Sequence, residues 1–342
     1  MDITVLTSSD PTCDKFVERM PNGSLEHLPL WSFMIEKTFG HKSFYLVARE
    51  GQEIRGILPL MQIRSRLFGN RMVSQAFSNY GGPLANEPDA LEALYDHAVE
   101  LATDRGCESI EFHNLVPLTY DLLQSRDDKI TMHLPLMQDP DELWRSFRPE
   151  VRNQIRKAKK SHLVSICGGI ELISDFWSLW SKRMHELGTP CYPRKLFYNI
   201  FQAFPKNVQI FLVQLDDLTV GGAFVYCYKG LVQIRWAATL IEYNRLCPNN
   251  LLYWSVMKHY CLAGASTFDF GRSTVGSTQH KFKKQWGAKP IQLYYQYWSP
   301  PEKQLSLITP DNPKYRKKVE MWKKLPLWMT RLAGPYISRS LA

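Results

Sequence analysis

Two stretches of this chain repeat the same order of elements, and this repeat constrains the fold more than any other feature. In the first stretch, residues 43–64 read as two strands joined by a tight turn at Glu50-Gly51. A further strand region follows, and residues 89–105 place apolar side chains at the spacing of a helix. Residues 109–115 close the stretch as a strand.

The second stretch begins with residues 209–240, which read as two strands turning at Asp216-Asp217 and then a third strand. A loop, a helix over 251–263 and a strand over 267–271 follow. Two copies of a unit with a mixed sheet and a crossover helix predict an α/β (α+β) protein of two related lobes. We expect the lobes to join near residues 139–150, where a helix begins.

The net charge of +9 is concentrated in two segments. Residues 145–160 carry seven Lys/Arg and one Glu, and the chain from Pro310 carries eight Lys/Arg and two Asp/Glu, so each contributes +6. Such segments predict local anionic partners, namely phosphate groups, nucleic acid or lipid headgroups. Solvated helix faces are the alternative.

The cysteines and the hydropathy indicate in which compartment the protein works and whether it spans a membrane. Seven cysteines are scattered without metal-ligand or disulfide spacing, which predicts reduced thiols, a cytosolic protein and no metal site. The first residues, MDITVLTSSDPTCDKF, lack the basic and apolar regions of a signal peptide. There is no run of about 18 apolar residues, so we expect no membrane-spanning helix.

Residues 264–286 contain the pattern most indicative of chemistry. An apolar strand holds one carboxylate, Asp269, and Gly271, Arg272 and Ser273 follow directly. Such a strand end, with a polar loop and lysines after it, can build a pocket for an anionic ligand and a reacting nucleophile. A strand end held by a salt bridge is the alternative. The basic, aromatic segment after the loop contains Lys281, Phe282, Lys283, Lys284 and Trp286.

Asp269 is the strongest candidate for a catalytic or substrate-orienting carboxylate. It alternates with Phe268 and Phe270 along the strand and therefore faces the other side. Apolar neighbours would favour a base that works near neutral pH, and Arg272 would oppose that effect. If Asp269 and Arg272 pair, the carboxylate positions other groups instead of taking a proton.

Four motifs occur in a fixed order: FRPEVRNQIRKAKK, MHELGTPCYPRKLF, NRLCPNNLLYWSVMKHYCLAGASTFDFGRS and HKFKKQWGAKPIQLYY. This order resembles the FemAB-like transferases, most of all the proteobacterial branch associated with exopolysaccharide and PEP-CTERM protein-sorting gene clusters. The resemblance covers about residues 40–300. It implies two tandem GNAT-like lobes, 1–140 and 141–300, of which the second is catalytic, and a basic amphipathic tail at 301–342.

The resemblance implies an acyltransferase that moves an acyl or aminoacyl group to an amine or hydroxyl of a cell-envelope or exopolysaccharide precursor. We expect direct attack by the acceptor, without a covalent enzyme intermediate. Two alternatives stay open: aminoacyl-tRNA-dependent transfer to a peptidoglycan peptide, and a non-catalytic protein that binds a partner in a basic cleft.

Acyl-CoA or aminoacyl-tRNA would serve as co-substrate, with no permanently bound cofactor. In GNAT-type lobes the loop before the crossover helix cradles the donor's pyrophosphate, but here residues 243–250 contain no glycine. The implied partners are a glycan or peptide precursor in lipid-linked form, tRNA and an anionic membrane. The expected location is cytoplasmic, or peripheral on the inner face of the cytoplasmic membrane.

We expect Asp269, Arg272 and Lys281 to act in catalysis. For several binding candidates a structural role is the alternative: a helix N-cap for Asn249 or Asn250, and the core for the two tryptophans. Arg152 and Arg156 lie four residues apart on one helix face, where they could meet phosphate or tRNA. The substrate-binding candidates are Asn249, Asn250, Ser273, Lys283, Lys284, Trp286, Trp236, Arg152 and Arg156.

Residues 313–342 combine Lys and Arg with Trp and Leu at helical spacing. This pattern suits a helix lying on an anionic membrane surface. A helix packed back on the protein through its aromatic face is the alternative.

Overall fold

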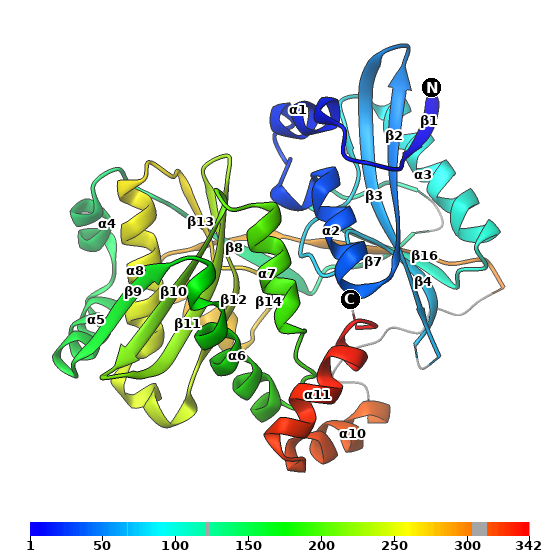
Figure 1. The fold of residues 1–342 in the computed structure, drawn as a ribbon. Helices are drawn as coiled ribbons and strands as arrows, with labels where there is room; N and C mark the ends of the chain where they lie inside the picture. The colour runs from blue at the N-terminus through cyan, green and yellow to red at the C-terminus, as the bar shows by residue number, and fades with distance from the viewer. Residues whose placement is uncertain (67, 121–122, 303–312, 342) are drawn as a thin grey trace. The chain divides into compact units, whose positions relative to one another are not determined.

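The computed structural model describes residues 1–66, 68–120, 123–302 and 313–341, and Figure 1 shows its helices and strands. The chain forms two units, each built around one mixed sheet. The first contains Met1–Lys129, the strand β16 (Tyr294–Trp298) and the residues from Arg339. The second contains Ile130–Ile291 and the last two helices.

The first unit consists of one sheet and the three α-helices described below. Its helices are α1 (Pro11–Arg19), α2 (Pro29–Phe39) and α3 (Pro88–Asp104). Across the sheet, the strands are β1 (Asp2–Leu6), β2 (Lys42–Glu50), β3 (Glu53–Ser65), β4 (Gly69–Ser74), β6 (Ser109–Asn114), β16 and β7 (Gln124–Arg126), and β5 (Leu84–Ala85) pairs with β3.

Local sequence explains the order of these elements. Gly51 turns the chain between β2 and β3 at φ 58°, in the left-handed region where glycine is unstrained. On α3, Leu94, Ala98 and Ala102 recur four residues apart and are fully buried against the sheet. The helix is the crossover between β4 and β6, which pair in parallel and therefore need a long connection.

The second unit repeats this plan with more helices. Its helices before the tail are α4 (Pro140–Ser146), α5 (Pro149–Lys160), α6 (Ile173–Leu187), α7 (Arg194–Ala203), α8 (Pro248–Leu262) and α9 (Thr278–Gln285). Across the sheet, the strands are β14 (Ser273–Thr274), β8 (Lys129–Pro135), β13 (Thr267–Asp269), β12 (Leu231–Thr239), β11 (Leu218–Tyr228), β10 (Val208–Leu215) and β9 (Leu163–Gly168), and β15 (Lys289–Gln292) pairs with β8.

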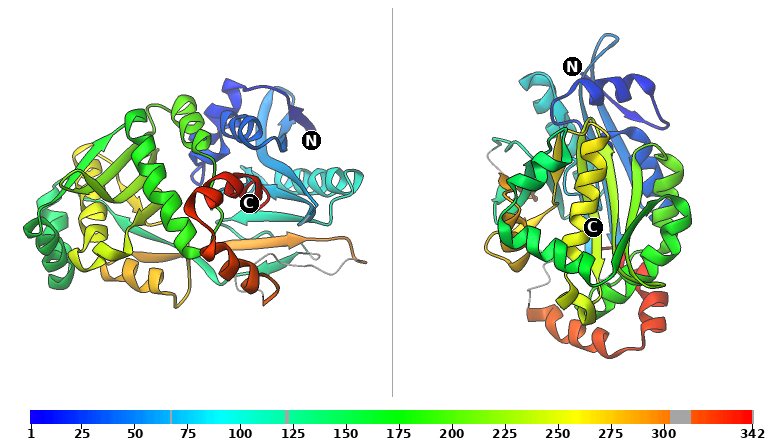
Figure 2. Two further views of the ribbon diagram at one scale, coloured as in Figure 1. Left: turned by 60° about the horizontal axis from the view of Figure 1, so that its bottom comes forward. Right: turned by 90° about the vertical axis from the view of Figure 1, so that its left-hand side faces the viewer.

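Strand alternation assigns the two faces of the second sheet to different helices. Ala223 and Val225 of β11 point into the core that α8 covers, whereas Gly222 and Phe224 point to the α6 side. Figure 2 shows α8 in yellow on one face of this sheet and the green helices α6 and α7 on the other. A two-residue period with apolar side chains on both faces is what a sheet covered by helices on both sides requires.

Both units therefore run three antiparallel strands, a crossover helix, and a strand parallel to the third strand. In the first unit this series is β2, β3, β4, α3 and β6, and in the second it is β10, β11, β12, α8 and β13. The predicted α/β (α+β) class with two tandem lobes is confirmed.

Two strands near the predicted boundaries belong to the other sheet than those boundaries imply. The strand β8 precedes residue 140 but pairs with β13 of the second sheet, and β16 follows the second lobe but pairs with β6 and β7 of the first. The sheet to which β8 or β16 belongs depends on pairing between strands far apart in the sequence, and local sequence patterns do not reveal it. The division at residues 140 and 300 stays a prediction about domains.

The predicted tail contains two helices, α10 (Pro313–Lys324) and α11 (Leu327–Ser338), and both contact α6. Residues 303–312 of that predicted tail lie outside the described residues. Among the helices that the structure describes, none combines the length and the hydropathy that crossing a bilayer would take.

Candidate functional site

The strands β12 and β13 separate partway along the second sheet. They pair in parallel over three positions only, ending at Gln233 opposite Asp269. Beyond this point β12 continues to Thr239, while the chain after β13 turns at Gly271, whose φ of 75° is in the left-handed region. The strand separation leaves the second half of β12 without its parallel neighbour, next to the turn.

Asp269 ends β13 and is fully buried, at 0% exposure. Its carboxylate accepts hydrogen bonds from Thr131 Oγ1, from Gln233 Nε2 at 2.8 Å and from the backbone N–H of Gly271 at 2.8 Å. His133 Nε2 lies 3.8 Å from the same carboxylate. These bonds tie β8, β12 and the turn together, so this carboxylate organises the strand end and does not itself face solvent.

Lys283 reaches this turn from α9 and is the buried lysine of the basic segment, at 6% exposure. Its ammonium donates to the carbonyl oxygens of Gly271 at 2.7 Å and Arg272 at 3.0 Å. Burial lowers the pKa of Lys283 to about 8; the Asp269 carboxylate opposes this shift and the Arg272 charge adds to it. A cation is therefore held at the end of β13 by two carbonyl dipoles.

Polar atoms without a hydrogen-bond partner lie on the elements around this turn. Among the residues that the structure describes, Ser273 Oγ, Trp286 Nε1 and His133 Nε2 are buried and make no hydrogen bond within the protein. Buried polar atoms are normally paired, so such atoms indicate where water or a ligand group completes the bonding.

A cationic and aromatic cluster lies along the separated part of β12. The Arg235 guanidinium is 5.4 Å from the Trp236 ring centroid, and the Trp236 ring lies 6.1 Å from that of Tyr192. Burial raises the pKa of Tyr192, and the charges of Arg235 and Arg272 oppose the rise. The two arginines thus act on one phenol from β12 and from the turn after β13, which makes a positive environment suited to an anion.

Sequence reasoning missed Tyr192, Arg235, Gln233, Thr131 and His133. The strand QIRW did carry a signal, because Gln233 and Arg235 alternate with apolar residues on a strand otherwise suited to the core. Tyr192 lies in the segment between α6 and α7, and only the fold brings it to β12.

The crossover helix α8 begins differently from the prediction. Its N-cap is Cys247, at φ 61° and without a side-chain cap, and Pro248 is the first helical residue. Asn249 and Asn250 therefore lie within the first turn, and the prediction that one of them is the N-cap is wrong, because Pro248 already supplies a helical φ at N1. Asn250 Nδ2 instead donates to Gln154 Oε1 of α5 at 2.8 Å.

The structure gathers only part of the predicted site at the turn. Asp269, Arg272, Ser273 and Lys283 meet there. Lys281 and Lys284 are exposed on α9, because the face of that helix which packs inward carries Lys283.

Trp286 belongs to the hydrophobic core, where it meets Phe147 edge to face at 5.1 Å. Trp236 is half-buried in the cluster with Arg235. On α5, Arg156 is exposed and lies 5.5 Å from the Trp144 ring, whereas Arg152 is half-buried.

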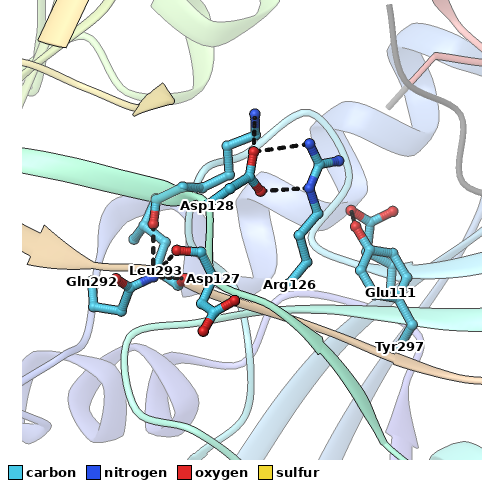
Figure 3. Close-up of polar contacts among 8 residues, drawn as sticks. Glu111, Arg126, Asp127, Asp128, Gln292, Leu293 and Tyr297 are labelled. Atoms are coloured by element: carbon cyan, nitrogen blue, oxygen red, sulfur yellow. Dashed lines mark hydrogen bonds and ion pairs between the residues drawn. The ribbon is translucent and has the colours of Figure 1, made fainter. Parts of the chain in front are cut away.

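A second polar cluster lies in the first unit, at the edge formed by β6, β16 and β7. Glu111 Oε1 accepts hydrogen bonds from Tyr297 OH at 3.1 Å and from His113 Nε2 at 3.0 Å. Figure 3 shows Glu111 beside Tyr297, with the Arg126–Asp128 ion pair close by. Burial opposes ionisation of Glu111, but the hydrogen bond and charge of His113, with Arg71 and Tyr297, hold its pKa below the ordinary value.

Within the described ranges, no group of three or more His, Cys, Asp or Glu side chains is arranged to hold a metal ion.

Comparisons with known proteins identify a similar domain model and similar chains. Residues 145–284 match the model of an acetyltransferase (GNAT) domain, and this range contains β12, α8, β13 and α9 up to Lys284. A lipid II:glycine glycyltransferase of Staphylococcus aureus is 26% identical over 234 residues, covering 59% of this chain and 53% of that protein. The chain spans about half the length of the curated relatives it matches.

Solved structures resemble the chain over most of its length. The crystal structure of FemX has a TM-score of 0.66 at 18% identity, covering 86% of this chain and 97% of FemX. A tandem GNAT protein from the clavulanic acid biosynthesis pathway has a TM-score of 0.54 at 14% identity, covering 86% of this chain and 97% of that protein. Residues 145–284 are thus similar to a GNAT acetyltransferase domain, and the chain as a whole has the tandem GNAT fold.

Proposed function

We propose that this protein is a cell-envelope transferase that moves an acyl or aminoacyl group to an amine or hydroxyl of an envelope or exopolysaccharide precursor. The observation that carries the proposal is the buried Lys283 ammonium at the strand separation, within the segment that matches the acetyltransferase domain. The FemAB-like relatives support a transfer reaction on the envelope.

Lys283 is suited to stabilise developing negative charge. An ammonium has three N–H donors, and the carbonyls of Gly271 and Arg272 take two of them. We assign the third to the donor's carbonyl oxygen, which becomes an oxyanion when the acceptor attacks. A preorganised donor in a buried site stabilises that charge more than water would.

The reaction needs no covalent enzyme intermediate. The acceptor's amine or hydroxyl forms a new bond to the carbonyl carbon, and the bond from that carbon to the donor's thioester sulfur or ester oxygen breaks. The proton lost by the acceptor goes to the leaving group. Arg235 and Arg272 would hold the donor's phosphate groups by charge.

We assign Asp269 a positioning role and not that of a base. Its carboxylate already accepts three hydrogen bonds and has no exposed surface, so a substrate proton cannot reach it in this conformation. It holds Gly271 in place, and through that turn it holds Lys283. Lys281 is exposed on α9, so we transfer the predicted catalytic role from Lys281 to Lys283.

The second candidate is aminoacyl-tRNA-dependent transfer to a peptidoglycan peptide. One observation favours it: the segment before α8 is the 3-10 helix Ile241–Leu246, without the glycines that would let a pyrophosphate approach the backbone closely. The exposed basic face of α5, with Arg156, supplies charge for a phosphate backbone.

Thermal unfolding of the purified protein with a panel of acyl-CoAs and with charged tRNA distinguishes the two donors. A true donor at a hundredfold excess over its Kd stabilises the fold by about 2.7 kcal/mol. The donor that stabilises the protein is then tested for transfer with envelope precursors. Stabilisation by neither donor, together with no transfer, would leave the third reading, a non-catalytic binding protein.

Acyl-CoA and charged tRNA are made inside the cell, so we propose that the protein works in the cytoplasm. A lipid-linked acceptor would bring it to the inner face of the membrane.

A further inference from the structure

The helix α11 packs on the second unit through its small residues. Thr330, Gly334 and Ser338 follow one another at intervals of four and are buried. A Cβ on Gly334 would lie 3.0 Å from the backbone nitrogen and the Sγ of Cys191, and Ser338 Oγ donates to the Cys191 carbonyl at 3.1 Å. This face lies so close to the 191 segment that only small side chains fit.

The opposite face of α11 carries its large apolar residues. Trp328, Leu332 and Tyr336 also follow at intervals of four, and they are 66%, 66% and 71% exposed. They are offset by two residues from the buried row, which is about 200° around the helix. We call these three residues the outer row. The alternative that the tail packs back through its aromatic face is therefore wrong for Trp328 and Tyr336.

The preceding helix α10 carries a concentration of positive charge. Residues 316–324 carry five Lys/Arg and one Glu, a net charge of +4, and Met321 among them is 68% exposed. Figures 1 and 2 show α10 in orange and α11 in red, one after the other beside α6. Where the burial of α10 side chains is described, from residue 316 on, the exposed basic residues are Arg316, Lys317, Lys318, Lys323 and Lys324.

We propose that α10 and α11 bind the surface of an anionic lipid bilayer. Trp and Tyr side chains prefer the boundary between headgroups and acyl chains, Leu332 enters the apolar layer, and the α10 charges meet lipid phosphates. Because the small residues of α11 keep it anchored to α6 and the 191 segment, the helix can present the outer row without unfolding.

Charge complementarity selects this occupant over two others. A second copy of the chain would bring the same positive helix against itself, which opposes association. A nucleic acid would use the charges of α10 but would leave the outer row in water. The inference concerns the tail alone, and it holds whichever group the proposed reaction transfers.

Sedimentation of the full chain with vesicles tests the proposal. The vesicles contain phosphatidylcholine alone, or equal parts of phosphatidylcholine and phosphatidylglycerol. We expect binding to the anionic vesicles, weakened by salt, and little binding to the neutral ones. Equal binding to both would overturn the anionic part of the proposal, and binding to neither would overturn the whole.

The triple variant Trp328→Ser, Leu332→Ser and Tyr336→Ser should lower the vesicle partition coefficient at least about tenfold. These side chains point outward, so circular dichroism and the melting temperature should stay as in the parent protein. The control triple variant is Leu218→Ser, Ile241→Ser and Leu262→Ser, which removes exposed apolar side chains elsewhere on the unit and should bind as the parent does. Equal partition of the two triple variants would contradict the role of the outer row.

The charge of α10 is tested by Lys323→Gln with Lys324→Gln, which should weaken binding about 30-fold, at roughly 1 kcal/mol per charge. Lys195→Gln with Lys206→Gln, at two other exposed lysines, is the matched control. If the parent chain forms a dimer without lipid, and the outer-row variant abolishes that dimer, the occupant is a second copy and the proposal is overturned.

Discussion

Lys283 Nζ lies 2.7 Å from the carbonyl oxygen of Gly271, and the N–H of the same glycine lies 2.8 Å from Asp269. One peptide turn is therefore held by a buried cation on its carbonyl side and a buried carboxylate on its N–H side. The lysine and the carboxylate stabilise the same turn through different atoms, and on this basis we propose a role in the reaction for Lys283 and a positioning role for Asp269.

We predict that Lys283→Met lowers the rate of transfer about 100- to 1000-fold, the usual loss when one donor to an oxyanion is removed. Initial rates with the donor identified by thermal unfolding measure this. The exposed residue Lys258 of α8 provides the control, because Lys258→Met should change the rate less than twofold. Full activity of Lys283→Met would exclude the oxyanion role, while the donor-induced stabilisation would still report binding.

The stability of the protein relative to Lys283→Met should rise between pH 8 and pH 10. The folded-state pKa of about 8 is below the ordinary 10.5, so in this range the unfolded chain binds more protons than the folded one. Stability therefore increases with pH, by up to about 1.4 kcal/mol for each unit of pKa difference. Urea unfolding of both proteins at the two pH values measures it, and a constant difference would mean that Lys283 titrates normally.

Asp269→Asn should destabilise the second unit by about 2–3 kcal/mol. The amide places N–H donors against groups that already donate, such as the Gly271 N–H and Gln233, and leaves buried donors unpaired. Denaturant unfolding measures the loss, with Asp217→Asn in the exposed β10–β11 turn as control. If Asp269→Asn retains both stability and transfer, the carboxylate is dispensable; if transfer is absent from the parent protein as well, the binding-protein reading gains support.

Glu111→Gln should destabilise the first unit by about 1–3 kcal/mol at neutral pH. The folded-state pKa of Glu111 is below the ordinary 4.5, so its contribution is present above about pH 4.5 and disappears as the pH falls through the lowered value. The stability difference between the parent and the variant should therefore shrink on acidification. Unfolding curves at a series of pH values test this, with the exposed Glu92→Gln as the reference.

Asn250→Ala should cost about 1 kcal/mol, because it removes the bond from α8 to Gln154 of α5 at 2.8 Å. Its neighbour gives a matched control, since Asn249 makes no side-chain hydrogen bond in the part of the chain described and Asn249→Ala should cost less than about 0.5 kcal/mol. An equal cost for both would mean that the helix start, and not the bond to α5, sets the energy.

The elements of both lobes could be predicted from sequence because they depend on local periodicity and turn residues. The predicted helix over 89–105 matches α3, and the predicted strand over 267–271 contains β13. The candidate carboxylate was found from its place after an apolar strand. The burial of this carboxylate could not be predicted, because Thr131, Gln233 and Gly271 reach it from three separate parts of the chain.

The sequence alone determined the repeated order of strands and helices, the two basic segments and the position of the carboxylate at a strand end, since each depends on neighbours within a few residues. The tertiary structure decided that Lys283 faces the turn while Lys281 faces solvent. It also decided that β8 pairs in the second sheet and β16 in the first. It also decided that α11 buries Gly334 and exposes Trp328. The rotation of a helix and the partner of a strand depend on the space left by distant segments, and that space exists only once the chain has folded.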